Sequence, residues 1–276
     1  MFKTVGVKAK PDERAVRVSE EVVRYLGRQG LEVKVSEETA RRMTVEVDAV
    51  DLSEMDVDFL VTVGGDGTIL RTLRILPAAS PPILGINVGS IGFLAEICPE
   101  DMSDALDRVL KGEFVLEKAF QLKASLDNQN LPKALNEIAV MGKQLGKILR
   151  LEVYVNDNFI STALGDGVIV ATPTGSTAYC LSSGGPIIEP HLEGFAIVPI
   201  SAFRTSMIPL VVPSSSKVNI QVAKLNKDAV AIVDGQHQTI LKPGDEVIVQ
   251  KAETSVPFIR FEGSFYRRLR EKFLIR

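Results

Sequence analysis

The chain has 276 residues, 45% hydrophobic and 24% charged, which suits two globular domains, and its two cysteines, Cys98 and Cys180, exclude a disulfide framework and a four-ligand metal site. The formal net charge of −3 gives no electrostatic reason to expect nucleic acid or an anionic membrane as a partner. No apolar stretch reaches the roughly 18 residues that span a bilayer, and the first ten residues lack the apolar run of a signal peptide, so we expect a cytoplasmic protein.

Strand-like and helix-like segments alternate in the first third of the chain. Apolar residues recur at strand or helix spacing, which predicts strands over 2–7, 31–35, 58–63 and 82–87 and helices over 12–28, 69–76 and 99–111. The run Asp58–Val63 is apolar enough for a central strand that is buried on both faces of a parallel sheet. Alternation of this kind predicts a doubly wound α/β domain over residues 1–115.

Helical periodicity nearly vanishes after residue 117. Short β-rich segments follow at 120–126, 134–141, 149–155, 167–171, 195–199, 218–222, 229–233 and 246–250, with turn signals between them. Their spacing predicts an all-β domain over residues 116–252, built as a β-sandwich or as two packed sheets. The tail, 253–276, becomes helical again around Tyr266–Phe273, and either a solvated terminal helix or a clamp that packs back on the first domain fits its sequence.

The segment Gly64-Gly65-Asp66-Gly67-Thr68 stands where a buried strand ends and a helix begins. In open α/β sheets ligands bind at that edge, glycines let the backbone approach a phosphate, and a helix N-terminus favours an anion. A Walker A loop would need a lysine before the threonine, and a dinucleotide fingerprint would need a third glycine where Leu70 stands. The segment therefore predicts a different kind of phosphate loop.

Asp66 is the unusual member of this loop, because a carboxylate repels phosphate. It could accept the proton of an attacking hydroxyl or help to hold Mg²⁺, and the alternative is that it only caps the helix. The functional interpretation predicts a kinase that phosphorylates a small hydroxyl-bearing metabolite, with Asp66 as its base.

A second polar cluster lies in the β-rich part. The run from Asp166 to Tyr179 is strand-like up to Ala171 and then becomes a turn dense in hydroxyls. Short hydroxyls and free amides suit a nucleoside, on whose ring Tyr179 could stack, although a well-bonded turn would have the same composition. Asn136-Glu137 is chemically apt for an adenine edge and ribose hydroxyls, or it is the wet side of a strand.

Together these segments resemble the NAD kinase family over roughly residues 58 to 240 and in the same order. The glycine loop alone is shared with diacylglycerol and sphingosine kinases and, more loosely, with 6-phosphofructokinases. The run Thr172-Pro173-Thr174-Gly175-Ser176-Thr177-Ala178-Tyr179 is far more specific, and Asp234-Gly235-Gln236 also fits. The form Gly89-Ser90-Ile91-Gly92-Phe93-Leu94-Ala95-Glu96 is similar to archaeal members.

The resemblance implies that Asp66 accepts the proton of the adenosine-ribose 2′-hydroxyl of NAD, which attacks ATP, with Mg²⁺ arriving on the ATP and no dedicated metal site. The phosphate loop would comprise Gly64, Gly65, Gly67 and Thr68. The residues implied to bind NAD are Gly67, Arg71, Phe93, Asn136, Glu137, Lys147, Asp166, Thr177, Ala178, Tyr179, Cys180, Leu181, Ser182 and Gln236. A homodimer or homotetramer is implied too, with Ser201–Pro213 as a natural interface.

One departure from the family pattern concerns Leu164, which stands where many bacterial members carry an arginine, so a charged contact is missing there. Polyphosphate in place of ATP, and NADH in place of NAD, stay open as substrates. Two other functions stay open as well: a lipid kinase of the same superfamily, and a non-catalytic sensor that binds NAD(P) without turnover.

Overall fold

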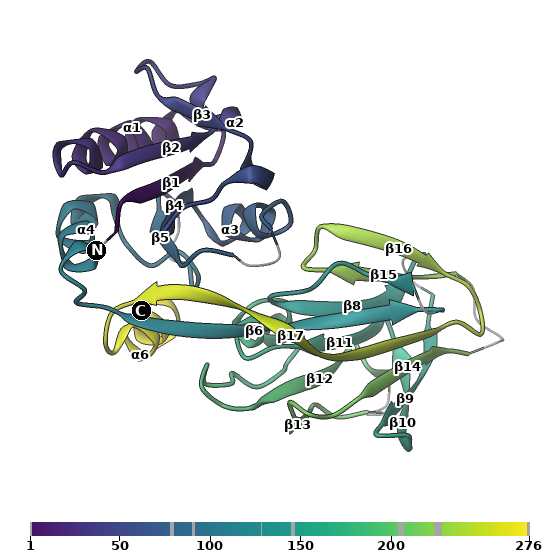
Figure 1. Cartoon of the computed structure of the whole chain (residues 1–276). Coiled ribbons are helices and arrows are strands. Elements are labelled where there is room, and N and C mark those ends of the chain that lie inside the picture. The colour runs from purple at the N-terminus through teal and green to yellow at the C-terminus, as the bar shows by residue number, and fades with distance from the viewer. Residues whose placement is uncertain are drawn as a thin grey trace. The chain divides into compact units, whose positions relative to one another are not determined.

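The computed structural model describes residues 2–77, 80–89, 92–127, 129–144, 147–203, 207–223 and 228–274 (Figure 1). The chain divides into two compact units. Unit 1 comprises residues 1–118 and 256–276, and unit 2 comprises residues 119–255. The boundaries expected from the sequence, after residues 115 and 252, lie close to these divisions. The last division falls inside one long strand, β17 (Glu246–Arg260).

Unit 1 is an α/β domain with a parallel sheet. Its elements are β1 (Thr4–Ala9), α1 (Glu13–Arg28), β2 (Glu32–Ser36), α2 (Glu37–Ala40), β3 (Asp48–Val50), β4 (Phe59–Gly64), α3 (Asp66–Leu73), β5 (Ile83–Asn87), α4 (Met102–Leu110) and α6 (Ser264–Leu269). The strand order is β5-β4-β1-β2-β3, and the end of β17 pairs in parallel with β5 at Phe258 and Ile83.

Helices cover both faces of this sheet, as expected for a doubly wound domain (Figure 1). The apolar stripes of α1 and α4 share one core with Val61, Val63, Leu84 and Ile86. Side chains alternate along a strand, so a Cβ added at Gly85, between Leu84 and Ile86, would lie on the opposite face of the sheet. It would meet Ile69 of α3 at 3.1 Å. The helix α3 therefore packs on the other side.

Unit 2 is an antiparallel β-sandwich. Its elements are β6 (Val115–Leu126), β7 (Gln129–Asn130), β8 (Glu137–Gly142), β9 (Leu149–Val155), β10 (Asn158–Gly165), β11 (Gly167–Ala171), α5 (Tyr179–Ser182), β12 (Gly194–Ile200), β13 (Leu210–Pro213), β14 (Val218–Val222), β15 (Ala229–Val233), β16 (His237–Leu241) and most of β17. One sheet contains β10-β9-β14-β17, and the other has the order β13-β12-β11-β8-β15-β16.

The central strand β11 shows how the second sheet is buried on both faces. Val168 and Val170 enter the main core between the two sheets, together with Val153 of β9. Ile169 and Ala171 point the other way, into a smaller core that includes Cys180 of α5. The segment after β11 thus returns over the outer face of its own sheet, which is why the whole strand is apolar.

Several elements differ from the sequence-based prediction in their bounds. The helix α3 begins at Asp66 rather than at residue 69, because the glycine loop itself forms the first turn, with the Thr68 N–H donating to the Gly65 carbonyl at 2.8 Å. The strand β17 continues ten residues beyond the expected end at 250, since its middle is polar and partly exposed and lacks an apolar signature. The edge strands β10, β13 and β16 were not expected for the same reason.

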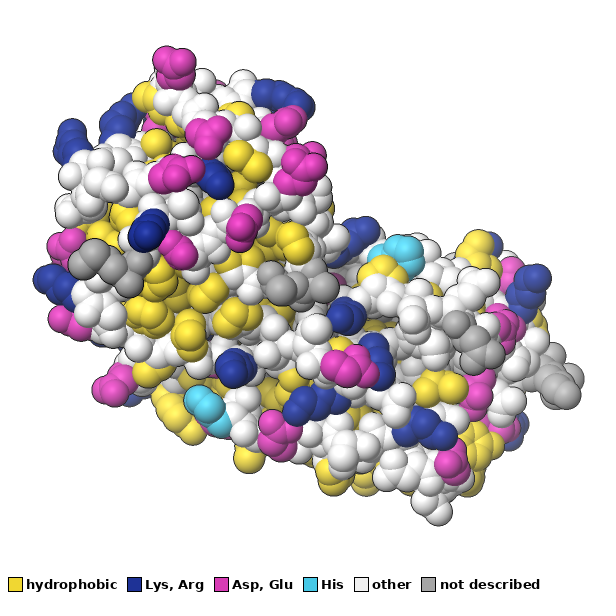
Figure 2. Space-filling view, viewed as in Figure 1, with side chains coloured by type: hydrophobic (Ala, Val, Ile, Leu, Met, Phe, Trp, Pro, Cys, Tyr) yellow, Lys and Arg dark blue, Asp and Glu magenta, His cyan; other side chains and the backbone are white. Residues whose placement is uncertain are grey.

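The surface charge is mixed. Lys and Arg side chains are interspersed with Asp and Glu on the face in Figure 2, in keeping with the net charge of −3.

None of the helices in the described part of the chain has both the length and the apolar character needed to cross a membrane.

Candidate active site

The carboxyl ends of three parallel strands in unit 1 meet at one edge of the sheet. Gly64 at the end of β4 pairs with Asn87 at the end of β5. On the other side, Lys10 directly follows β1, and its N–H donates to the Val63 carbonyl at 2.8 Å. The glycine loop therefore lies between the strand ends that carry Lys10 and Asn87, at the edge where ligands bind in such sheets.

Asp66 is the first residue of α3, but its carboxylate is bound by another segment of the chain. Oδ2 accepts a hydrogen bond from the Phe93 N–H at 2.9 Å, and Oδ1 accepts from the N–H groups of Leu94 and Ala95 at 3.0 and 3.1 Å. No side-chain hydrogen bond among the described residues caps α3. We call these three donors the amide cradle. The contacts show a carboxylate held in place, and helix capping does not account for them.

Two kinds of glycine surround this carboxylate. A Cβ added at Gly92 would lie 2.1 Å from Asp66 Oδ1, so the amide cradle requires glycine there. At Gly65 and Gly67 an added Cβ would meet no protein atom within 4 Å. Packing within the protein therefore does not explain Gly65 or Gly67, whereas close approach of a ligand to the backbone does.

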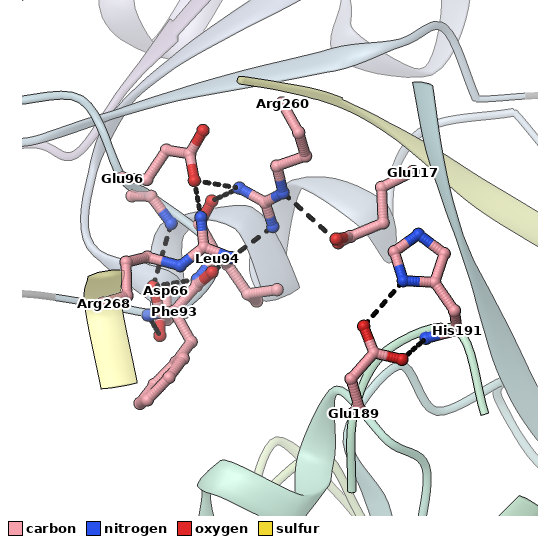
Figure 3. Close-up of polar contacts among 10 residues, drawn as sticks. Asp66, Phe93, Leu94, Glu96, Glu117, Glu189, His191, Arg260 and Arg268 are labelled. Carbon is pink, nitrogen blue, oxygen red and sulfur yellow. Dashed lines mark hydrogen bonds and ion pairs between the residues drawn. The ribbon is translucent and has the colours of Figure 1, made fainter. Parts of the chain in front are cut away.

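A buried ion-pair network lies behind the amide cradle (Figure 3). Arg260, at the end of β17, donates to the carbonyls of Leu94 and Phe93 at 2.8 and 3.3 Å. Its side chain is 3% exposed and also contacts Glu117 and the fully buried Glu96. Arg268 of α6 pairs with the same Glu96. The C-terminal segment of the chain thus fixes the backbone that holds Asp66.

Asp66 opens onto a pocket of about 290 Å³, which we call the glycine-loop pocket. Its lining residues are Lys10, Gly65, Asp66, Gly67, Thr68, Arg71, Asn87, Val88, Gly89, Gly92 and Lys272. Three cationic side chains therefore accompany one carboxylate, and the backbone of a helix N-terminus forms part of the wall. This arrangement suits a polyanion with a reacting group beside Asp66.

In unit 2, Asp234 organises the start of β8. Its carboxylate accepts hydrogen bonds from the N–H groups of Leu135, Asn136 and Glu137 at 2.8, 2.8 and 3.1 Å. Asp234 and Gly235 both have positive φ, 48° and 65°, so the turn between β15 and β16 is left-handed and brings the carboxylate back toward β8. The Asp-Gly-Gln motif therefore fixes the backbone at the start of β8.

Glu137 is a buried carboxyl whose Oε2 makes no hydrogen bond with any described residue. Burial, and secondly the negative charge of Asp234, raise the pKa of Glu137 to about 8. At neutral pH the side chain is therefore mostly a neutral carboxylic acid, which can both donate and accept a hydrogen bond. A diol of a sugar ring is one partner that would satisfy it.

The hydroxyl-rich turn after β11 packs on the same segment. Thr172 donates its hydroxyl to the Leu135 carbonyl at 2.6 Å, and its N–H donates to the Asn136 carbonyl at 2.9 Å. A Cβ added at Gly175 would lie 2.0 Å from that Asn136 carbonyl. The Ser176 hydroxyl accepts from the Ile188 N–H at 2.9 Å and donates to the Pro173 carbonyl. The hydroxyls of Thr172 and Ser176 therefore stabilise the turn itself, which was the alternative to a direct contact with a nucleoside.

The residues that follow this turn border Glu137. Cys180 is fully buried, and burial followed by the charge of Glu137 raises the pKa of its thiol to about 11, so it is an unreactive thiol. Tyr179 is 36% exposed, and burial together with the charges of Asp166 and Glu137 raises its pKa. Asp166 and Ser182 are exposed, and Thr177, Ala178, Leu181 and Gln236 are partly exposed.

The structure brings the expected site residues into two groups. The glycine loop and Arg71 line one pocket, while Phe93 lies buried against Phe265 and Phe273 and contributes its N–H to the amide cradle. In unit 2, the Asp234 carboxylate binds the N–H groups of Asn136 and Glu137, and Cys180 lies close enough to Glu137 for the charge of Glu137 to raise its pKa. Lys147 is exposed in the β8–β9 connection, and no side-chain hydrogen bond or ion pair among the described residues joins it to that group.

Sequence reasoning missed Lys10, Lys272, Glu96, Arg260 and Arg268. These residues lie far from the glycine loop along the chain, and only the pairing of β17 with β5 and the return of α6 bring the C-terminal ones to it. The described residues contain no group of three or more His, Cys, Asp or Glu side chains arranged to hold a metal ion.

Comparison with known proteins identifies both units. Residues 5–114 match the ATP-NAD kinase N-terminal domain, and residues 135–261 match the ATP-NAD kinase C-terminal domain. The chain is 41% identical over 276 residues to an NAD kinase of Methanothermobacter thermautotrophicus, covering 98% of this chain and 96% of that protein. It is 40% identical over 267 residues to an NAD kinase of Thermococcus gammatolerans, covering 95% and 96%.

Two solved structures share the fold. Yeast NADH kinase complexed with NADH has a TM-score of 0.87 at 25% identity, covering 99% of this chain and 87% of that one. An NAD kinase from Archaeoglobus fulgidus in complex with ATP has a TM-score of 0.77 at 32% identity, covering 97% and 98%. With both domains matched and relatives similar over nearly the whole length, the chain belongs to the NAD kinase family.

Proposed function

We propose that this protein is an NAD kinase, a phosphotransferase with an alcohol acceptor that transfers the γ-phosphoryl group of ATP to the adenosine-ribose 2′-hydroxyl of NAD. Family membership supports this activity. The observation that carries it is the carboxylate of Asp66, held by three amide donors in a pocket that is otherwise cationic. A phosphate-binding loop without a reaction to promote has no need of that carboxylate.

The chemical step is a displacement at phosphorus. The 2′-oxygen forms a bond to the γ-phosphorus, the bond from that phosphorus to the β–γ bridging oxygen breaks, and ADP leaves with the electron pair. The hydroxyl proton passes to the Asp66 carboxylate and then to solvent. Asp66 has about four lone-pair positions and accepts three amide hydrogen bonds, so one position is left for the hydroxyl.

Positioning is the main contribution of the other groups in unit 1. A ribose hydroxyl is a weak nucleophile, and phosphoryl transfer is promoted mainly by alignment and by neutralising charge. The N–H groups of Gly65 and Gly67 at the start of α3 would bind phosphate oxygens, and Arg71 would neutralise their charge. Lys10 borders the same pocket, although Asp12 already pairs with it at 3.0 Å.

A divalent cation, Mg²⁺ by expectation, would arrive on the phosphates of the donor. The glycine-loop pocket fits this mode, since Asp66 is the one carboxylate among its described lining residues and the remaining oxygen ligands would come from the triphosphate and water. When bound, the cation neutralises charge on the phosphates during transfer.

The acceptor would bind through unit 2. Glu137 would exchange hydrogen bonds with the ribose hydroxyls, and Asn136 would bind the adenine edge. Asp166, Gln236, Lys147 and the segment Thr177–Ser182 would complete the dinucleotide site, together with Phe93 and Arg71. The uncharged Glu137 supports this role, because its buried Oε2 makes no hydrogen bond with the described residues and a ribose hydroxyl would supply one.

We further propose a cytoplasmic homodimer or homotetramer. The exposed apolar side chains of Phe203, Ile208 and Val211 support an interface at residues 201–213, where residues 204–206 lie outside the described part of the chain. Analytical ultracentrifugation of the purified protein measures its oligomeric state. Assays with ATP or polyphosphate as donor and with NAD or NADH as acceptor identify the substrates.

The deciding experiment is a coupled assay for NADP with Mg-ATP and NAD, run beside dispersed diacylglycerol and a panel of donors that includes polyphosphate. With the transferred phosphate of the donor labelled, label in lipid but none in NADP would refute the proposal in favour of a lipid kinase. Asp66→Asn keeps the shape and two acceptor positions, so NAD binding should persist while kcat falls by about 10²–10⁴-fold. NADP formation at the wild-type rate would exclude Asp66 as the base, and NAD binding without turnover by the wild-type protein would identify a sensor.

A further inference from the structure

The C-terminal helical turn, Arg270–Leu274, reaches the glycine-loop pocket through one side chain, Lys272. The turn is attached to the segment that forms the amide cradle at two points. Arg268, just before it, pairs with the buried Glu96, and the Phe273 ring stacks on the Phe93 ring with centroids 5.6 Å apart. Both anchors lie within the segment 93–96, so the position of the turn is set beside Asp66.

Between these anchors, Lys272 extends over the Phe93 ring. Its Nζ lies 4.7 Å from the ring centroid, within the range of a cation–π contact. The N–H of Phe93 donates to Asp66 Oδ2 at 2.9 Å, and Lys272 and Asp66 both line the glycine-loop pocket. The side chain is exposed, and it lines the pocket rather than the outer surface alone.

Lys272 differs from Lys10 in having no counter-ion within the described part of the chain. Lys10 pairs with Asp12 at 3.0 Å, whereas no ion pair of Lys272 occurs among the described residues. The ring face of Phe93 orients the ammonium without neutralising its charge, which is then available to an anion in the pocket. An ammonium on a flexible stem is a suitable point-charge ligand for a phosphate oxygen.

We infer that Lys272 binds the phosphate chain of the phosphoryl donor, so that the C-terminal helical turn forms part of the donor site. The inference rests on the proposed kinase function. It assigns a donor-binding role to a residue 204 positions after Thr68, the end of the glycine loop. This residue lies in a segment beyond residue 261, where the match to the C-terminal family domain ends.

The test compares Lys272→Met, which keeps most of the stem against Phe93, with Lys272→Arg, which keeps the charge. Lys251→Met is the matched control, because Lys251 also lies over a phenylalanine ring, that of Phe120 at 4.9 Å, but in unit 2 and outside this pocket. Steady-state kinetics are measured with ATP and NAD varied separately. Mg-ATP binding is also titrated by calorimetry without NAD.

For Lys272→Met we expect kcat/KM for ATP to fall about 10- to 100-fold, as for loss of one charge-assisted hydrogen bond, and Mg-ATP to bind correspondingly more weakly. The KM for NAD should stay within about twofold, Lys272→Arg should recover most of the loss, and Lys251→Met should behave as the wild type. Unchanged Mg-ATP binding by Lys272→Met would overturn the inference. So would equal losses for ATP and NAD accompanied by a lower melting temperature, which would indicate a merely structural role.

Failure of the proposed function has a different signature. A wild-type protein that forms no NADP from Mg-ATP and NAD would refute the kinase proposal, while the calorimetric comparison of Lys272→Met with the wild type would still decide whether Lys272 binds the triphosphate.

Discussion

The substitution Gly92→Ala should disable the site by adding one carbon atom. A Cβ at this position would lie 2.1 Å from Asp66 Oδ1 and 2.8 Å from its Cγ. The strain therefore falls on the carboxylate, which must move by roughly 1 Å to restore an ordinary van der Waals separation.

The size of the effect follows from the amide cradle. Oδ1 accepts from Leu94 and Ala95 at 3.0 and 3.1 Å, and a displacement of about 1 Å takes at least one of these bonds out of range. A hydrogen bond to a charged group contributes about 1.5–3 kcal/mol, and a misplacement of about 1 Å in a catalytic group can cost about 100-fold in rate. We expect kcat to fall by about 100-fold.

The assay is NADP formation at saturating substrates, with thermal unfolding measured in parallel. Gly27→Ala is the control, since a Cβ there meets nothing within 4 Å and α1 should gain up to about 1 kcal/mol without a change in kcat. The double variant Gly92→Ala/Asp66→Asn should be no slower than Asp66→Asn alone if Gly92 acts only through Asp66. A kcat for Gly92→Ala within about twofold of the wild type would refute the reasoning.

Two further predictions concern buried charges. Burial and the charge of Asp234 raise the pKa of Glu137 from 4.5 to about 8 in the folded protein. As the pH rises, the unfolded chain loses this proton before the folded protein does. The free energy of unfolding therefore falls between about pH 4.5 and pH 8, by at most about 5 kcal/mol. Urea unfolding at pH 5.5 and 8.5 should show Glu137→Gln gaining on the wild type at the higher pH, and parallel pH profiles would contradict this. Glu96→Gln leaves Arg260 and Arg268 buried without their shared counter-ion, which should cost about 3–5 kcal/mol and lower the melting temperature by on the order of 10 °C. An unchanged melting temperature in scanning calorimetry would show that this ion pair does not stabilise unit 1.

Local patterns in the sequence predicted much of the fold correctly. The parallel α/β domain, the antiparallel β domain and the family could all be read from the chain, because an apolar strand such as Phe59–Val63, a helix stripe such as that of α1 and a glycine loop depend on neighbouring residues. Strands at sheet edges were missed, since partly exposed residues such as those of β13 and β16 carry no strong apolar alternation. The beginning of α3 was misplaced because its first turn is polar.

The sequence alone identified Asp66 and Glu137 as residues of interest, since each stands in a motif whose chemistry is legible from residue type. What holds them was decided only by the tertiary structure. Asp66 depends on amides 27 to 29 residues away and on Arg260 beyond them, and Glu137 owes its uncharged state to burial beside Asp234, 97 residues away. Hydrogen bonds and burial of this kind depend on distances in space, which spacing along the chain does not encode.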